Sequence, residues 1–452
     1  MLYHVYESQA GNYFGYGYDG SMQSFGNYNP QYSSMNEFNN YVSRVQYIMQ
    51  NGKAVRDIAI YEQVYDATSS NLDSYAVDDS IEEAGYTYDI LNPGYMELDN
   101  CYAKDGVIDP DGGRYKALVV YQPLTVNCKE EVLQYNPWTG EYTYGDQESY
   151  LDGQYISLTA ADKFLQYAKA GVPIITVGDY NSFHAAGIGE SDEDLHAIFA
   201  QIDKLGMLYK ADSDDNVVSQ LNRAGVTCDA KKDSDSRIVS WKQAFTSEDE
   251  GVNADFYWLF NYQQGEGNDY NEGEAVSQKI SLKGTGIPYQ VDLWSGQVTP
   301  VGNYVTTDDG YITLDISLAA YDTAMYVIVS SSQDVLHATN ISSSDGNAAT
   351  ASVSYNSNGN LVLTASANGV YKVSLSDGTS RNVTISGAEK EIQLSAFDLT
   401  VESWTSGYGY TESKKSISDE LVKTTLNPVS VTDLTAQTWD HLTFTDDTGK
   451  KI

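Results

Sequence analysis

Three cysteines and five histidines are the side chains best suited to nucleophilic or metal chemistry, and their spacing favours neither. Cys101, Cys128 and Cys228 form no CxxC pair and no Cys/His zinc pattern. Cys101 and Cys128 lie in loops rich in acidic residues, where a thiolate is disfavoured. The segment TVGDYNSFH carries His184 after an apolar run, but it contains no cysteine in a G-x-C-x-G turn. We expect no cysteine-based catalysis and at most one disulfide within the chain.

Acidic residues dominate the charge, with 63 Asp and Glu against 26 Lys and Arg and a formal net charge of -37. Two acidic runs, DPDGG at 109–113 and DSDDN at 212–216, resemble calcium loops but lack the full pattern that ends in Glu. The segment GIGESDED at 187–194 lacks the Lys-Ser/Thr of a phosphate loop, and its acids suit the first turn of a helix. The charge also repels phosphate backbones and anionic lipids, so nucleic acid and membranes are poor partners.

Aromatic residues are unusually frequent, with 38 Tyr and 6 Trp. A ring with an apolar face and a polar edge suits stacking on sugars and bonding to their hydroxyls. Tyrosine is equally common on half-buried strands, so composition leaves sugar binding and strand packing open.

The first half of the chain predicts a doubly wound α/β domain over 41–235. A helix is expected from Met35 to a C-capping Gly52, after a glycine-rich aromatic loop at 1–40. Four short apolar runs at 55–63, 86–92, 115–122 and 172–179 are separated by helical stretches, which favours a parallel sheet. The helix 158–170 closes at Gly171 and leads directly into the strand that follows it, as in a right-handed crossover.

The second half predicts antiparallel β-structure. Short strands and turns indicate a β-sandwich at 236–332 and a second β-rich domain at 333–400, whose hairpins are marked by NG and DG. Residues 401–452 are expected to form an incomplete β-rich domain, because no closing element follows their strands. Two glycosylation sequons begin at Asn340 and Asn382, which predicts exposed strand ends.

Five segments in a fixed order resemble the non-barrel part of the calcium-dependent α-L-rhamnosidase family of glycoside hydrolases. They are YVSRVQYIMQNGKAVRDIAIY, DGVIDPDGGRYKALVVYQ, DFYWLFNYQ, PYQVDLWSGQVTPV and ITLDISLAAYDTAMYVIV. The resemblance implies that 1–40 is a remnant of a (β/α)8 barrel and that 41–235 is a flavodoxin-like, glutaminase-like accessory domain. It also implies that the family's catalytic glutamates lie on earlier strands, so no catalytic residue is assigned.

The resemblance implies one histidine and an aromatic loop as substrate-binding groups: His4, followed by Tyr16, Tyr18 and Phe25. Glu7, Asp19 and Glu37 lie near the expected barrel remnant, but we expect them to be surface carboxylates. A glycosidase needs two carboxyl groups roughly 5–10 Å apart, and none here is marked as such a pair. The chain is expected to hold no cofactor and no metal, although the resemblance implies calcium in a full-length enzyme.

These observations leave three functional hypotheses. The first is a partial glycoside hydrolase of the α-L-rhamnosidase type, extracellular or at the cell surface, acting on plant or microbial polysaccharide that contains rhamnose or a similar sugar. The second is a non-catalytic carbohydrate-binding or scaffold module, and the third is an adhesin-like array. The start of the chain has no basic region followed by an apolar one, so any secretion signal is expected in a longer precursor.

Overall fold

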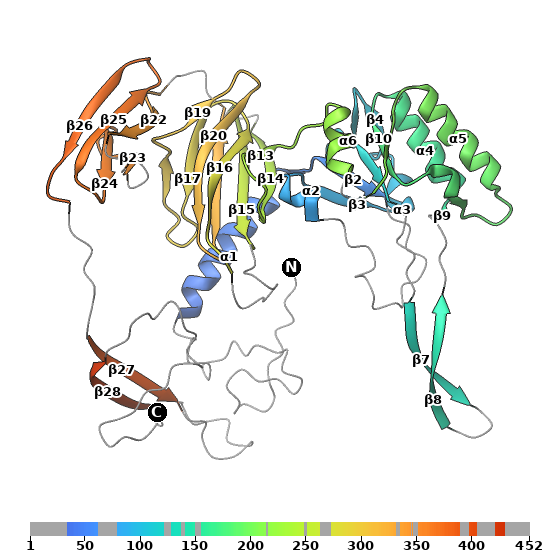
Figure 1. The fold of residues 1–452 in the computed structure, drawn as a ribbon, viewed down its shortest axis with the longest axis horizontal. Coiled ribbons are helices and arrows are strands. Elements are labelled where there is room, and N and C mark those ends of the chain that lie inside the picture. Colours follow the sequence, from blue (N-terminus) through green and yellow to red (C-terminus); the bar gives the residue numbers. More distant parts are fainter. Residues whose placement is uncertain are drawn as a thin grey trace. The chain divides into compact units, whose positions relative to one another are not determined.

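A computed structural model describes most of the chain between residues 34 and 429. The described ranges are 34–61, 79–121, 128–136, 141–149, 155–213, 216–247, 251–262, 273–330, 335–344, 346, 351–388, 397–404 and 421–429. They belong to two compact units, one of Gln46–Ala365 with Gly369–Ile385, the other of Met1–Val45, Ser366–Asn368 and Ser386–Ile452. The structure is mixed α/β with many antiparallel sheets (Figure 1).

Helix α1 (Met35–Gln50) confirms the first predicted helix. Gly52 follows it with a φ of +91°, and a Cβ there would lie 2.5 Å from the carbonyl oxygen of Ala244. The position therefore requires glycine for its backbone conformation and for space. The smaller unit contains the N-terminal part of α1, up to Val45, and an antiparallel pair, β27 (Phe397–Trp404) with β28 (Leu421–Val429).

A five-stranded parallel sheet forms the centre of the α/β part of the larger unit. Its spatial order is β3 (Tyr88–Leu91), β2 (Ile58–Tyr61), β6 (Leu118–Val120), β10 (Ile174–Val177) and β12 (Leu208–Ala211). Numbered along the chain this order is 2-1-3-4-5, which is a doubly wound arrangement. Four strands match predicted runs. Strand β12 was not predicted, because its four residues include a lysine and form no apolar run.

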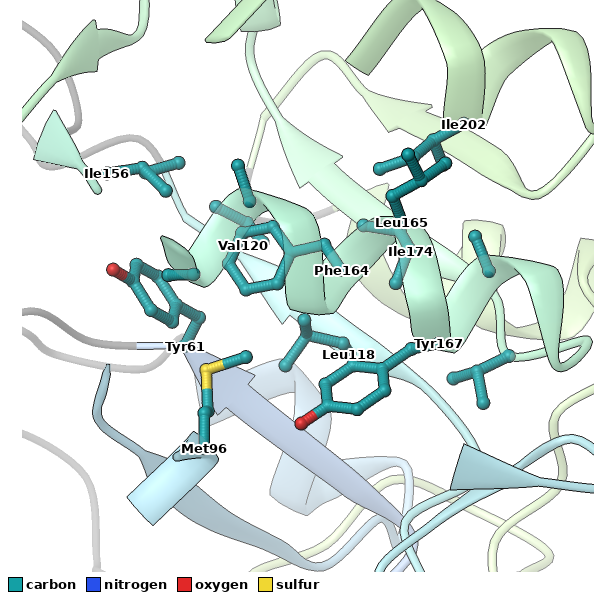
Figure 2. Packing of buried hydrophobic residues seen from close by; sticks show 14 of the residues in the cluster. Tyr61, Met96, Leu118, Val120, Ile156, Phe164, Leu165, Tyr167, Ile174 and Ile202 are labelled. Carbon is teal, nitrogen blue, oxygen red and sulfur yellow. The ribbon is translucent and has the colours of Figure 1, made fainter. Parts of the chain in front are cut away.

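Helices cover both faces of this sheet. On one face, α4 (Leu158–Lys169) and α5 (Asp192–Lys204) contribute Phe164 and Ile202 to a cluster with Leu118 and Ile174 (Figure 2). On the other face, α2 (Asp79–Glu83) and α6 (Val217–Arg223) pack on the alternate strand residues. The three central strands β2, β6 and β10 are thus buried on both faces, which explains their continuous apolar runs in the sequence.

Short elements outside the five-stranded sheet complete the α/β part. They are α3 (Pro93–Met96), β4 (Ala103–Lys104), β5 (Val107–Ile108), β9 (Tyr155–Ile156), a 3-10 turn (Tyr180–Ser182) and β11 (His184–Ala185). A hairpin of β7 (Cys128–Asn136) and β8 (Glu141–Ser149) follows β6 in the chain and was not predicted.

Two antiparallel sheets form a sandwich. The six-stranded sheet runs β1 (Lys53–Val55), β14 (Ile238–Ser247), β15 (Val252–Asn261), β21 (Thr323–Val329), β17 (Ile287–Val291) and β18 (Val298–Pro300). The four-stranded sheet runs β13 (Ala230–Lys232), β16 (Val276–Lys283), β20 (Tyr311–Leu318) and β19 (Val305–Thr306). Buried residues of both sheets share one core, which includes Tyr257, Leu282, Leu314 and Ile316.

The sandwich takes short strands from both sides of the parallel domain. β1 pairs antiparallel with β14, and β13 pairs antiparallel with β16. The chain thus leaves the sandwich after β1, forms the parallel sheet, and returns to the sandwich at β13. The domain divisions drawn from the sequence stay predictions.

A smaller β-rich part follows the sandwich. It contains β22 (Ala338–Ser343), β25 (Gly369–Leu375) and β26 (Ser380–Ile385) in one sheet and β23 (Ala351–Tyr355) with β24 (Leu361–Ala365) in another. The predicted NG and DG hairpins are confirmed, with Gly359 and Gly378 at φ of +75° and +79°. Asn340 and Asn382 are both exposed on their strands.

A chain of alternating charges joins the parallel sheet to the sandwich. Lys116 Nζ lies 2.8 Å from Asp57 Oδ1 and 2.5 Å from Asp229 Oδ1. Lys242 Nζ lies 3.0 Å from Asp229 Oδ2 and 3.5 Å from Asp255 Oδ2. Burial raises the pKa of Asp57, whereas for Asp229 the two lysines outweigh burial and lower the pKa. The joint is therefore ionic and largely removed from water.

Candidate functional site: a cleft beside the sandwich

A cleft of about 710 Å³ lies between the sandwich and the smaller β-rich part. This volume is within the roughly 300–1,000 Å³ of small-molecule sites. Four short segments that are far apart in the sequence line it: 284–287, 304–307 with 310–311, 335–339, and 376–377. All of them belong to the larger compact unit.

The turn between β16 and β17 forms one wall and depends on Gly286. Its φ is +139°, and a Cβ there would lie 2.0 Å from the carbonyl oxygen of Val329. Only glycine allows the turn to pass this close to β21. The opposite turn is held by Thr307, whose hydroxyl donates to Asp309 at 2.5 Å and accepts from the Tyr311 amide at 3.1 Å. Contacts within the protein therefore fix the conformation of both turns.

An aromatic pair and backbone hydrogen bonds join the two β-structures. The rings of Tyr304 and His337 stack with centroids 3.6 Å apart and planes 11° from parallel. His337 Nδ1 lies 2.7 Å from the carbonyl oxygen of Val335, so this nitrogen carries a proton and donates. The backbone amide of Tyr304 donates to Ala338, and that of Ala338 donates to Gly302. The stack and these bonds fix the position of the 335–339 wall.

The remaining lining mixes hydroxyl groups with apolar side chains, namely Ile287, Val305, Val335 and Leu336. Hydroxyl groups come from Thr285, Thr306, Thr307, Thr339 and Ser376. Asp377 is the single carboxylate among the described lining residues, and hydrogen bonds from Thr379 lower its pKa. Such a surface suits a neutral ligand rich in hydroxyls. These lining residues do not provide the two carboxyl groups that glycoside hydrolysis requires.

The substrate-binding residues expected from the sequence, His4, Tyr16, Tyr18 and Phe25, lie outside the described residues, as do Glu7 and Asp19. Glu37 lies in the first turn of α1 and is exposed, as expected for a surface carboxylate. Tyr304, His337 and the cleft threonines were missed at the level of sequence. The sequence feature that could have pointed to them is the polar turn VTTDDG at 305–310. Such turns are common in hairpins, and they do not indicate which distant loop lies opposite.

Cysteine chemistry is disfavoured at the two cysteines whose side chains are described. Cys101 and Cys228 are buried and make no disulfide. Burial raises the pKa of both thiols, that of Cys228 to about 12. His184 forms a pair with Asp192, with Nδ1 2.9 Å from Oδ2, beside the ring of Tyr155. No described cysteine or serine hydroxyl is bonded to this imidazole, so the pair lacks a nucleophile there.

The acidic segment at 187–194 is a helix start, as predicted. Ser191 caps α5 by accepting from the Asp194 amide at 3.2 Å, and three acids occupy the first turn. Among the described residues, no three His, Cys, Asp or Glu side chains are grouped to hold a metal ion. No helix in the described ranges is both long and apolar enough to cross a membrane. The calcium implied by the resemblance stays a prediction.

Similarity to known proteins is limited to solved structures. No protein-family model matches the chain, and no curated protein matches it. The chain is similar to a rhamnosidase from Novosphingobium sp. PP1Y, with 14% identity and a TM-score of 0.44 over 82% of this chain and 34% of that chain. It is also similar to an exo-carrageenase from Bacteroides ovatus, with 9% identity and a TM-score of 0.32 over 66% of this chain and 32% of that chain. The chain spans about a third of each.

Proposed function

We propose that this chain is part of a glycoside hydrolase of the α-L-rhamnosidase type and contributes glycan binding and support to it. The five sequence segments that occur in the same order as in that family support the assignment. With the assignment we propose that 41–235 is a flavodoxin-like accessory domain and that 1–40 is a barrel remnant. The observation that carries the binding role is the cleft itself, which combines hydroxyl groups, apolar side chains and a single carboxylate among its described residues. An extracellular or cell-surface location is part of the same proposal.

The single carboxylate also favours the alternative function, a non-catalytic carbohydrate-binding or scaffold module. Both retaining and inverting glycosidases need a second carboxyl group across the scissile bond. The two functions differ in whether sugar is released. We expect no measurable release from aryl α-L-rhamnosides by the purified chain, with or without calcium. Turnover above the buffer rate would show that the catalytic pair is present in this chain.

Binding tests the function directly. We expect methyl α-L-rhamnoside to bind with a Kd near millimolar, or about -4 kcal/mol, in isothermal titration calorimetry. A neutral ligand is chosen because the charge of -37 repels acidic glycans. Thr306→Trp, which fills the cleft from an exposed position, should weaken binding, whereas Ser352→Trp on exposed β23 should not. Flat titrations across a panel of rhamnose-containing glycans would contradict the proposal.

A further inference from the structure

A second, smaller pocket of about 200 Å³ lies where the parallel sheet meets β14. Its walls are Ile238–Trp241 on one side and Arg56, Glu82 and Gly85–Tyr88 on the other. The volume equals that of about seven water molecules at roughly 30 Å³ each, which is room for one ring-sized ligand. None of its lining residues belongs to the larger cleft.

An incomplete strand pairing creates this pocket. β1 pairs with Lys242, Gln243 and Ala244 of β14 and then ends at Val55. Residues Ile238–Trp241 therefore have a described partner strand on the β15 side alone. The Ile238 amide donates to the Ser236 hydroxyl at 3.4 Å, and the other backbone groups on this side line the pocket as donors and acceptors.

The Ser240 hydroxyl adds to these groups. Ser240 is 8% exposed and lines the pocket. Among the described residues its side chain forms no hydrogen bond, so the hydroxyl is available to bond a ligand in the pocket.

Ionic and aromatic groups complete the walls. Arg56 Nη1 donates to the carbonyl oxygens of Val55 at 2.9 Å and Lys242 at 3.3 Å, and the side chain is 11% exposed. Glu82 accepts from the hydroxyls of Tyr88 and Tyr262. Trp241 is 36% exposed, and the centroid of its ring lies 5.1 Å from that of Trp258. An indole beside fixed polar groups matches the apolar face and polar edge of a sugar ring.

We propose that this pocket binds a single neutral sugar residue, separately from the larger cleft. The assignment rests on the proposed carbohydrate function and adds a second site to it. The strand edge and Ser240 bond the hydroxyls of the sugar, and Trp241 contacts its ring. The volume matches a single ring, and the opposite charges of Arg56 and Glu82 favour an uncharged ligand.

Fluorine NMR of 5-fluorotryptophan-labelled protein tests this site. The chain has 6 Trp, and the Trp241 resonance is assigned with Trp241→Phe. Methyl α-L-rhamnoside and methyl α-D-glucoside are the probes. We expect the Trp241 resonance to shift on titration and that of Trp294, which is 58% exposed on another turn, to stay unchanged. Trp241→Ala should weaken the binding of these probes in calorimetry by about tenfold.

Two further variants separate the outcomes. Ser240→Ala should weaken binding severalfold without changing thermal unfolding, and Trp294→Ala should leave it unchanged. If sugar binds in calorimetry but the Trp241 resonance does not move, this pocket is not a sugar site, while the proposed function stands. If Thr306→Trp abolishes all binding, the larger cleft is the sole site and the inference is overturned. If neither probe binds at all, both proposals are wrong.

Discussion

Lys116 should be the most sensitive position of the joint between the parallel sheet and the sandwich. Its ammonium contacts Asp57, which is 1% exposed at the side chain, and Asp229, which is 13% exposed. It also donates to the carbonyl oxygen of Thr227 at 2.9 Å. Lys116→Met removes one of the two lysines from a chain of charges with three carboxylates. Breaking a buried pair in this way costs about 3–5 kcal/mol.

We expect Lys116→Met to lower the free energy of unfolding by about 3 kcal/mol, the lower end of this range. The loss stays at that end because Asp57 keeps its hydrogen bonds from Thr87 and from the Asp229 amide. A loss of this size lowers the Tm by roughly 6–12 °C for a domain of 150–250 residues. Thermal unfolding followed by circular dichroism measures it. Lys279→Met is the matched control, since the Lys279–Asp315 pair has side chains 58% and 60% exposed and is worth about 0–1 kcal/mol.

The loss of stability caused by Lys116→Met should also depend on pH in a defined direction. The pKa of Asp57 in the folded chain is raised by burial, and Lys116 opposes that rise. Without Lys116 the pKa rises further, so folding favours the protonated carboxyl below that pKa and loses stability as pH rises through it. Lys116→Met should therefore be more damaging at pH 7.5 than at pH 4.5. A loss below 1 kcal/mol, or an equal loss at both pH values, would refute an ionic joint.

Three other residues give sharp expectations. Gly286→Ala should lower the free energy of unfolding in urea by at least about 2 kcal/mol, because its Cβ would meet the carbonyl oxygen of Val329. The control Gly359→Ala, at positive φ in open space, should cost roughly 1 kcal/mol. Equal losses for the two variants would contradict the close approach to Val329. Burial lowers the pKa of Lys232 to about 8, so between pH 8 and 10.5 the unfolded chain binds an extra proton at this residue. The free energy of unfolding should therefore rise with pH by at most about 3 kcal/mol. Lys232→Met should remove this rise, which urea midpoints at pH 7.5 and 9.5 measure. Ser191→Ala should cost about 1 kcal/mol by removing the cap of α5, and an unchanged Tm would show that the cap contributes nothing.

Local signals were sufficient for most elements. α4 ends before Gly171 at a φ of +90°, and α5 begins at a Ser191 cap, both at the positions that their residue types indicate. These features depend on neighbours within a few residues, so they can be predicted without the fold. The central parallel strands β2, β6 and β10 were found for a similar reason, since burial on both faces leaves an uninterrupted apolar run. β12 lacked such a run and was missed.

The two pockets could not be predicted in this way. Tyr304 and His337 stack although 32 intervening residues separate them, and Arg56 meets Trp241 only because β1 crosses to the sandwich before the parallel sheet begins. Residue types along the chain determined the secondary structure, the acidic surface and the absence of a cysteine nucleophile from the predicted turn. Tertiary structure alone decided which loops meet, because contacts between distant segments depend on strand pairing and on the packing of whole sheets.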